Sequence, residues 1–257
     1  MSKPKYKLYA SSSGFIWGRL VFTDYKTGCL RNVLLQSRGV KEGEIDEKYK
    51  IMGALHEQLH EDMLKSHKTP YEREFVIKYK VVDDVEFSGR ADFVIPNIRV
   101  EELKSTDSKN TMKKIMKDGK VRTEHLAQIT GYMIPLKMDT GRLIYGYYEK
   151  NADTQNYEKK FDRAFEILID DAGRICIDGT PSGFTVGDYL SYTKAAAHVV
   201  KTGEIWSRPN NWTSKFASPC KTCPWSKSCD KIDQGLIEGD VAFVNDALNT
   251  LKAKEKA

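Results

Sequence analysis

Three neighbouring segments with alternating polar and apolar residues constrain the fold more than any other feature of the chain. They read "EFVIKYKVV" (74–82), "VEFSGRADFVI" (85–95) and "NIRVEELKS" (97–105), with turn residues at Asp83-Asp84 and Pro96-Asn97. Segments rich in β-branched residues with a period of two are typical of strands, and short turns of this kind join antiparallel neighbours. The sequence therefore predicts a three-stranded meander.

Helices and further strands are expected on both sides of this meander. Residues 45–67 carry apolar residues at a spacing of four, which predicts an amphipathic helix that ends near His67. These apolar residues are Ile51, Leu55, Leu59 and Met63, with Met52 on a neighbouring row. Further along we expect a mobile loop or loosely held basic helix (107–123), a firm helix (123–136), two strands (142–150 and 155–163) and another helix (185–203). This order favours an α/β sheet covered by helices.

The composition limits the class of protein. Of the 257 residues, 40% are hydrophobic and 30% charged, and no apolar run approaches the roughly 18 residues that a membrane-spanning helix requires. The first residues lack the pattern of a secretory signal, so we expect a cytoplasmic protein. Lysine and arginine (41) outnumber aspartate and glutamate (36), and the net charge of +5 suits a polyanionic partner.

Charged residues within the meander need an explanation, because a charged side chain on a buried strand costs several kcal/mol unless it is paired. Glu102 and Lys104 share one face, since strand side chains on a face repeat every two residues. Asp92 lies at a similar distance from the Pro96-Asn97 turn and can reach the same end of the sheet. Two carboxylates and an ammonium group suit phosphodiester hydrolysis with a divalent cation. A surface edge strand or a salt-bridged strand end is the alternative.

Residues beyond this cluster complete a pattern that resembles the PD-(D/E)XK nucleases. The matching residues are His56 in "GALHEQ", Asp92 in "GRAD", Glu102, Leu103 and Lys104 in "EELKS", and Gln128 and Tyr132 in "QITGY". The chain is most similar to the branch shared by RecB-type nuclease domains and CRISPR-associated adaptation exonucleases, and it is a candidate for a phage-encoded member of this branch. The resemblance implies a restriction-endonuclease-like core, in which helices flank a central mixed sheet.

The chain departs from the pattern of this family at two places. The family often has Gly-x-x-x-His on its first helix, whereas this chain has Gly53-x-x-His56, and His60 follows one helical turn later as the reserve candidate. Ala91 precedes Asp92 where the family name has proline, which is tolerated because the aspartate is the metal ligand.

The resemblance also implies a role for each matching residue. His56, Asp92, Glu102 and the backbone carbonyl of Leu103 would hold Mg²⁺ or Mn²⁺, Lys104 would act in catalysis, and Gln128 and Tyr132 would lie near the active site. Gln128 and Tyr132 stand one helical turn apart and so face the same side. Glu101 should face away from Glu102 and pair with a cation such as Arg99.

The cysteines indicate a second metal centre, because clustered cysteines in a reducing cytoplasm bind metal more often than they form disulfides. Cys220, Cys223 and Cys229 lie close together in "SPCKTCPWSKSC", and Cys29 lies far upstream. This arrangement resembles that of iron-sulfur members of the same branch and implies a [4Fe-4S] cluster that joins the two chain ends. Zinc is the alternative, since four thiolates also suit it. Cys176 is expected to pack as a small hydrophobic residue.

We therefore expect a single nuclease domain over residues 1–257, with an iron-sulfur subdomain formed by its N- and C-terminal segments. The core would span about 50–165, the cluster-binding segments about 20–40 and 205–232, and a C-terminal helix or tail 233–257. The expected activity is that of a metal-dependent DNA exonuclease on single strands or DNA ends, in recombination, repair or CRISPR adaptation. The alternative is a catalytically silent, cluster-stabilised module that binds DNA or docks to a subunit. The expected DNA contacts are Lys113, Lys114, Lys117 and Arg122.

Overall fold

The computed structural model describes residues 6–9, 30–37, 47–119, 121–203 and 229, and the chain divides into two compact units. The first unit consists of Met1–Glu44, Tyr79–Ser88 and Tyr192–Ala257, and the second of Ile45–Lys78 and Gly89–Ser191. Every described residue that the sequence places in the candidate active site belongs to the second unit.

The first unit contains a short parallel strand pair. Strand β1 (Tyr6–Tyr9) pairs with Val85–Ser88, the first residues of β3. Tyr79 stacks on Phe87 with ring centroids 4.7 Å apart, and Leu8 is fully buried. Helix α2 (Leu30–Ser37) and the end of α6 (Val186–Thr202) also belong to this unit.

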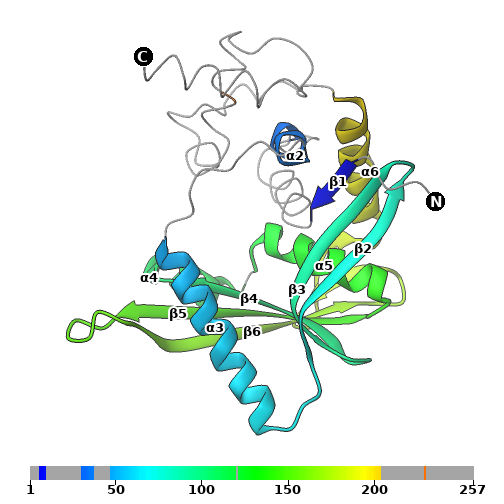
Figure 1. The fold of residues 1–257 in the computed structure, drawn as a ribbon. Coiled ribbons are helices and arrows are strands. Elements are labelled where there is room, and N and C mark those ends of the chain that lie inside the picture. Colours follow the sequence, from blue (N-terminus) through cyan, green and yellow to red (C-terminus); the bar gives the residue numbers. More distant parts are fainter. Residues whose placement is uncertain (1–5, 10–29, 38–46, 120, 204–228, 230–257) are drawn as a thin grey trace, which may run out of the picture. The chain divides into compact units, whose positions relative to one another are not determined.

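The second unit is built on a mixed sheet with the strand order β3-β4-β5-β6-β7-β8, of which Figure 1 labels β3 to β6. The strands are β3 (Val85–Ile95), β4 (Arg99–Thr106), β5 (Thr140–Lys150), β6 (Tyr157–Ile169), β7 (Arg174–Ile177) and β8 (Thr180–Thr185), and β2 (Glu72–Val82) pairs with β3. The β4–β5 pair is parallel, and the other neighbours in this order are antiparallel. The predicted meander and the predicted central mixed sheet are confirmed.

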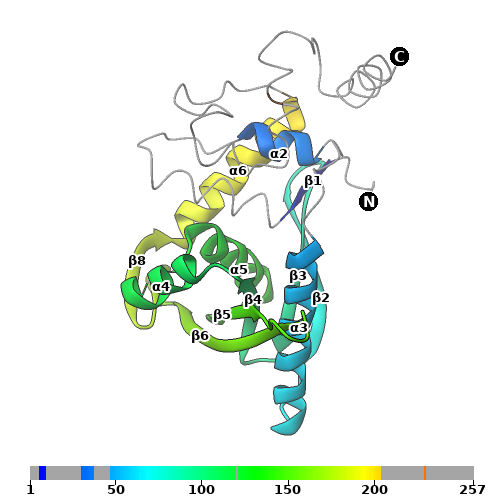
Figure 2. The same ribbon diagram turned by 90° about the vertical axis from the view of Figure 1, so that its left-hand side faces the viewer.

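Helices cover both faces of this sheet. Helix α3 (Glu47–Ser66) lies on one side, and α4 (Lys109–Asp118) and α5 (Thr123–Leu136) lie on the other (Figure 2). A parallel strand pair requires a crossover connection, and α4 and α5 together form the crossover between β4 and β5. This arrangement places α5 against the face that carries Glu102.

Helix α3 forms where the sequence predicts it, but the predicted buried face is wrong. The buried residues are Met52, His56, His60 and Leu64. Three of the residues expected to be buried are exposed instead: Ile51 by 49%, Leu59 by 36% and Met63 by 38%. The buried face is rotated by one residue, and on it His60 contacts Glu101 of the sheet, a polar contact that apolar periodicity does not reveal.

The basic segment after β4 forms a capped helix, α4, rather than a mobile loop. The Ser108 hydroxyl accepts a hydrogen bond from the backbone N–H of Thr111 at the start of this helix. At its end, Gly119 takes the left-handed conformation with φ of 59°, which glycine adopts without strain. Met112 and Ile115 bury the apolar side of the helix.

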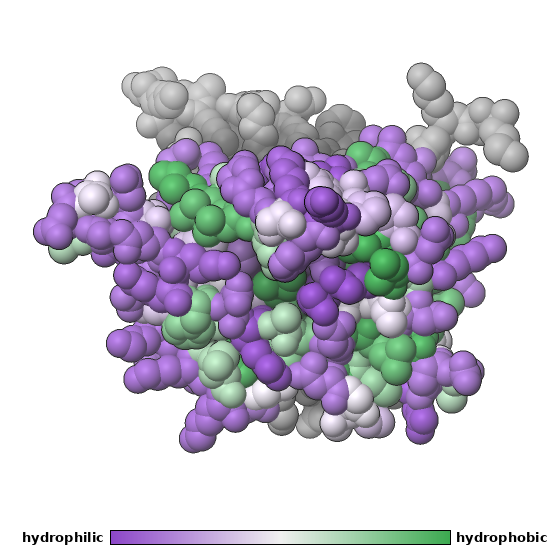
Figure 3. Space-filling view, turned by 90° about the horizontal axis from the view of Figure 1, so that it is seen from below, coloured by the Kyte–Doolittle hydropathy of each residue, from purple (hydrophilic) through white to green (hydrophobic). Residues whose placement is uncertain are grey.

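The face that is seen from below is mostly hydrophilic (Figure 3). Seen from below, apolar residues form small patches between charged and polar ones (Figure 3). Among the described helices, none combines the length and the apolar character that crossing a membrane requires.

Candidate active site

Asp92 and Glu102 lie on the same face of the sheet of the second unit. Phe93 is the register partner of Glu101, so the next residues along each strand, Asp92 and Glu102, both face the opposite side. The pairing of β3 with β4 runs from Ile95–Arg99 to Phe93–Glu101. Beyond it, Asp92 Oδ2 accepts a hydrogen bond from the backbone N–H of Leu103 at 2.7 Å. The predicted convergence of these two carboxylates is therefore supported by the strand register.

Lys104 links this face of the sheet to helix α5. Its Nζ donates to Glu102 Oε1 at 2.5 Å and to Gln128 Oε1 at 3.0 Å. Gln128 in turn donates from Nε2 to the hydroxyl of Tyr132 at 2.9 Å. The predicted residues Glu102, Lys104, Gln128 and Tyr132 thus form one hydrogen-bonded chain.

The surroundings disfavour the ionisation of both carboxylates. Burial raises the pKa of Asp92 well above its usual value, and the charge of Glu102 raises it further. Burial also raises the pKa of Glu102, although Lys104 opposes this. Glu102 Oε2 is buried and has no hydrogen-bond partner among the described residues. Paired, buried oxygen ligands with an unused lone pair are the donor set that a hard divalent cation prefers.

Two polar residues that the sequence analysis missed border Lys104 on this face. Tyr145 on β5 is the register partner of Lys104, and its hydroxyl lies 2.8 Å from Nδ1 of His125 on α5. Burial lowers the pKa of His125 well below its usual value, and the charge of Lys104 lowers it further. Burial therefore favours the neutral form of His125. The one indication of His125 in the sequence is its position three residues before Gln128, which places the two on neighbouring positions of one helix face.

Glu101 faces the other side of the sheet, as predicted, and does not enter the candidate site. Its carboxylate accepts hydrogen bonds from His60 Nε2 at 2.7 Å and Arg99 Nε at 2.7 Å, and Arg142 lies 3.7 Å away. Burial alone would raise the pKa of Glu101, but the hydrogen bonds from His60 and Arg99 outweigh it and leave this pKa lowered. His60, the reserve metal ligand, is therefore engaged in a buried hydrogen bond with Glu101.

The described contacts of His56 are with strand β5 rather than with the carboxylate pair. A side chain placed on Gly146 of β5 would meet the His56 ring at 2.8 Å, so the two residues are in close contact. Gly146 is the register partner of Ser105, which faces away from Lys104 and Glu102. Burial lowers the pKa of His56 to about 4, with a further contribution from the charge of Lys159. Its Nδ1 is buried without a partner among the described residues.

Glu57, the residue after His56, is electrostatically coupled to the candidate site. Its charge raises the pKa of both Asp92 and Glu102. Arg73 on β2 donates to its carboxylate at 2.8 Å. In the sequence, Glu57 rather than His56 stands four residues after Gly53, which is the spacing of the Gly-x-x-x-His motif named above.

Among the described residues, no group of three or more histidine, cysteine, aspartate or glutamate side chains is close enough to hold a metal ion. Cys29, Cys220 and Cys223 lie outside the described residues, and Cys229 is buried. Cys176 is free and buried on β7, which confirms its predicted packing.

The predicted DNA contacts lie at the surface around α4. Lys113, Lys114 and Lys117 are exposed residues of this helix, and Arg122 forms an ion pair with Glu124. Lys113 and Lys117 line a groove, and Lys114 does not.

Comparisons with known proteins give a match at the level of the fold. No protein-family model matches the chain, and no curated protein matches it by sequence. Among solved structures, an alkaline exonuclease from Laribacter hongkongensis aligns with 76% of this chain and 88% of its own, at 15% identity and a TM-score of 0.51. The chain therefore has the fold of an alkaline exonuclease.

Two further solved structures align less well. A phage-related exonuclease from Haemophilus somnus 129PT aligns with 77% of this chain and 96% of its own, at 12% identity and a TM-score of 0.49. The protein SSO0001 aligns with 88% of this chain and 87% of its own, at 17% identity and a TM-score of 0.47. The expected fold rests on the first alignment, and the iron-sulfur branch stays a prediction.

Proposed function

We propose that the protein is a metal-dependent DNA nuclease that acts as an exonuclease on single strands or DNA ends. The observation that carries this proposal is the pair of buried carboxylates, Asp92 and Glu102, with the Lys104 ammonium group beside them on one sheet face. The fold shared with an alkaline exonuclease supports it. The net positive charge of the chain suits DNA.

Asp92 and Glu102 fit a divalent cation such as Mg²⁺ or Mn²⁺. Both are oxygen ligands, the charge of Glu102 raises the pKa of Asp92, and Glu102 Oε2 has no other partner among the described residues. A bound cation would polarise a phosphoryl oxygen and lower the pKa of a bound water. The Leu103 carbonyl is the next proposed ligand. For a ligand from α3 the candidates are His56, predicted from the sequence, and Glu57, which the electrostatic coupling favours.

Lys104 would neutralise negative charge in the candidate site, and Gln128 and Tyr132 would orient Lys104. Lys104 places an ammonium group beside the carboxylates, where it would stabilise the negative charge that develops on the phosphoryl group. Gln128 accepts a hydrogen bond from Lys104 and donates one to Tyr132, so α5 fixes the direction of the ammonium group. Loss of either α5 residue would loosen Lys104 without removing it.

We also propose a [4Fe-4S] cluster held by Cys29, Cys220, Cys223 and Cys229, with zinc as the alternative. The four thiolates are the ligand set that supports this cluster. Anaerobically purified protein should be brown and contain iron and sulfide. A colourless protein with stoichiometric zinc would contradict the cluster without affecting the proposed nuclease.

The nuclease is tested by incubating the protein with end-labelled single- and double-stranded DNA, with Mg²⁺ or Mn²⁺, and with or without a chelator. We expect metal-dependent loss of nucleotides from an end, abolished by the chelator and by Glu102→Gln. DNA that is bound but never cut with either metal would contradict the nuclease and support a binding module instead.

A further inference from the structure

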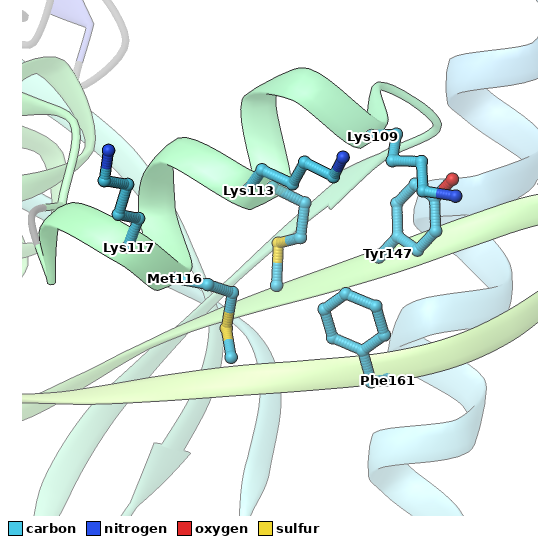
Figure 4. Close-up of a pocket in the computed structure, with 7 residues that line it drawn as sticks. Lys109, Lys113, Met116, Lys117, Tyr147 and Phe161 are labelled. Atoms are coloured by element: carbon cyan, nitrogen blue, oxygen red, sulfur yellow. The ribbon is translucent and has the colours of Figure 1, made fainter.

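A groove of about 540 Å³ lies between helix α4 and strands β5 and β6 (Figure 4). Its apolar floor comes from three elements: Met112 and Met116 from α4, Tyr147 from β5 and Phe161 from β6. Lys109, Lys113 and Lys117 line its side. The groove therefore combines an aromatic and thioether floor with a row of positive charges.

The three lysines form a single stripe along α4. They stand four residues apart, which places them above one another on one side of the helix. All three are exposed, and none of them forms an ion pair with a carboxylate in the part of the chain that the structure describes. Their charges are therefore available to an anionic partner.

The floor presents an aromatic ring to solvent. Phe161 and Tyr147 are direct register partners on neighbouring strands, with ring centroids 5.3 Å apart. Phe161 is 43% exposed, whereas Tyr147 is 5% exposed and donates from its hydroxyl to Glu149 at 2.7 Å. A register shift follows directly after Tyr147, and bulges of this kind redirect neighbouring side chains. Phe161 is thus held in place by its partner while one side stays open.

The groove lies on the same sheet face as the candidate active site. Thr106 is the register partner of Tyr147, and it faces the same side as Lys104 and Glu102 because the residues alternate along β4. Thr106 lies four residues after Glu102 along β4. At about 3.3 Å per residue, the two residues are about 13 Å apart. This corresponds to about four nucleotides at the stacked spacing of ~3.4 Å, and fewer in an extended strand.

We propose that this groove binds an unstacked base of single-stranded DNA on Phe161, while Lys109, Lys113 and Lys117 contact the neighbouring phosphates. The inference rests on the proposed function and adds the position at which one strand is held beyond the cleavage site. A base that is paired in a duplex cannot present its face to the groove, so the groove selects single strands. An open ring beside unpaired lysines offers both stacking and charge neutralisation, the two contacts by which proteins hold single strands.

The test is a binding titration of the full-length Glu102→Gln protein with a fluorescent single-stranded oligonucleotide in the presence of chelator. Phe161→Ala should weaken binding about tenfold, in line with the loss of one stacked base. Phe161→Trp should restore binding, because it returns an aromatic face. Phe161 is 43% exposed, so its truncation removes a surface ring and should leave the core intact.

The salt dependence separates stacking from charge contacts. Lys113→Ala and Lys117→Ala should each reduce the slope of log affinity against log salt by about 0.7, whereas Phe161→Ala should leave that slope unchanged. Lys78→Ala, an exposed lysine on β2, and Leu168→Ala, an exposed apolar residue of β6 outside the groove, are the matched controls. Both controls should bind like the parent protein.

Two results would overturn the inference. One is unchanged single-strand affinity in Phe161→Ala. The other is tight binding of a peptide of alternating leucine and glutamate that Phe161→Ala abolishes while DNA affinity stays the same, which would make the groove a peptide site. Because binding is measured without metal, failure of the groove leaves the cleavage assay unaffected. If the wild-type protein does not cleave DNA, weaker binding by Phe161→Ala would still support the groove as a site for single strands.

Discussion

At the residue scale, Lys104 joins the two sides of the candidate active site. Its ammonium group contacts a carboxylate on its own strand and an amide on the crossover helix. Because it is the cation nearest to the carboxylate pair among the described contacts, its removal leaves the negative charge that develops on a phosphoryl group without this partner.

Lys104→Ala should therefore lower the rate of DNA cleavage by about 100- to 1,000-fold while DNA affinity stays within a few fold. Single-turnover cleavage and a separate binding titration measure the two effects. Lys78→Ala, which removes an exposed lysine from β2, is the control and should cut DNA like the wild type. Normal cleavage by Lys104→Ala would exclude the role given to this residue.

His56 makes stability depend on pH. Its folded-state pKa is about 4, against 6.5 for an unperturbed histidine, so the unfolded chain binds more protons between these two values. Stability is therefore present above about pH 6.5 and is lost as pH falls toward 4. The expected loss between pH 7 and pH 5 is about 2 kcal/mol.

Urea unfolding at pH 7 and pH 5 measures this effect. The variant His56→Leu should lose this contribution, so that its free energy of unfolding changes less between the two pH values than that of the wild type. His67→Leu, which replaces an exposed histidine, should keep the wild-type dependence. Equal pH dependence in wild type and His56→Leu would show that His56 is not buried in its neutral form.

At the element scale, α3 is anchored to β4 by a buried ionic network. Glu101 is fully buried and accepts hydrogen bonds from His60 of the helix and Arg99 of its own strand. Phe93, Leu64 and Leu103 pack beside this network in one apolar cluster. Removal of one partner from a buried ion pair leaves an uncompensated charge, which is strongly destabilising.

Glu101→Ala should thus lower the free energy of unfolding by about 3 kcal/mol. Glu166→Ala removes an exposed partner of Arg142 and should change stability by less than about 1 kcal/mol. Chemical denaturation of both variants measures the difference. Similar stability losses in the two variants would contradict the importance of burial at Glu101.

Several elements could be predicted because their signals are local. The Pro96-Asn97 turn fixes the β3–β4 hairpin, and alternation along each strand then places Asp92 and Glu102 on one face.

The β7–β8 hairpin was missed, although its turn, Asp178-Gly179, has positive φ at both residues and is a typical hairpin pair. Its strands are only four and six residues long, so they show little periodicity.

The orientation of α3 could not be predicted from its own sequence. Apolar periodicity pointed to Ile51, Leu59 and Met63, whereas the structure buries His56 and His60. The partner of His60 is Glu101, which lies 41 residues further along the chain. A long-range polar contact of this kind leaves no trace in local hydropathy, and this is why the place of Glu57 near the candidate site was also missed.

At the scale of the whole molecule, a divalent cation should stabilise the fold. In the folded state the charge of Glu102 disfavours the ionisation of Asp92, and a bound cation would offset this repulsion. A ligand that binds only the folded state also raises the stability of that state by mass action. Mn²⁺ at 100 times its Kd should add about 2.7 kcal/mol to the free energy of unfolding and raise Tm.

Thermal unfolding with and without Mn²⁺ tests this expectation and identifies the ligand from α3. Glu102→Gln should lose most of the Mn²⁺-dependent shift. If Glu57 is the ligand, Glu57→Gln should reduce the shift and His56→Leu should not, and the reverse pattern would assign His56. A wild-type Tm that Mn²⁺ leaves unchanged would contradict a cation site at these carboxylates.

The parallel pairing of β4 with β5 has an evolutionary consequence. Between these strands the chain must travel back along the sheet, and this single return path, residues 107–139, carries both the lysine stripe and the Gln128–Tyr132 pair. Substitutions in this one continuous segment can therefore change both the binding of a DNA strand and the orientation of Lys104. The carboxylates on the neighbouring β3–β4 hairpin would stay unchanged. Exchange of that segment between related chains would move substrate preference as a unit.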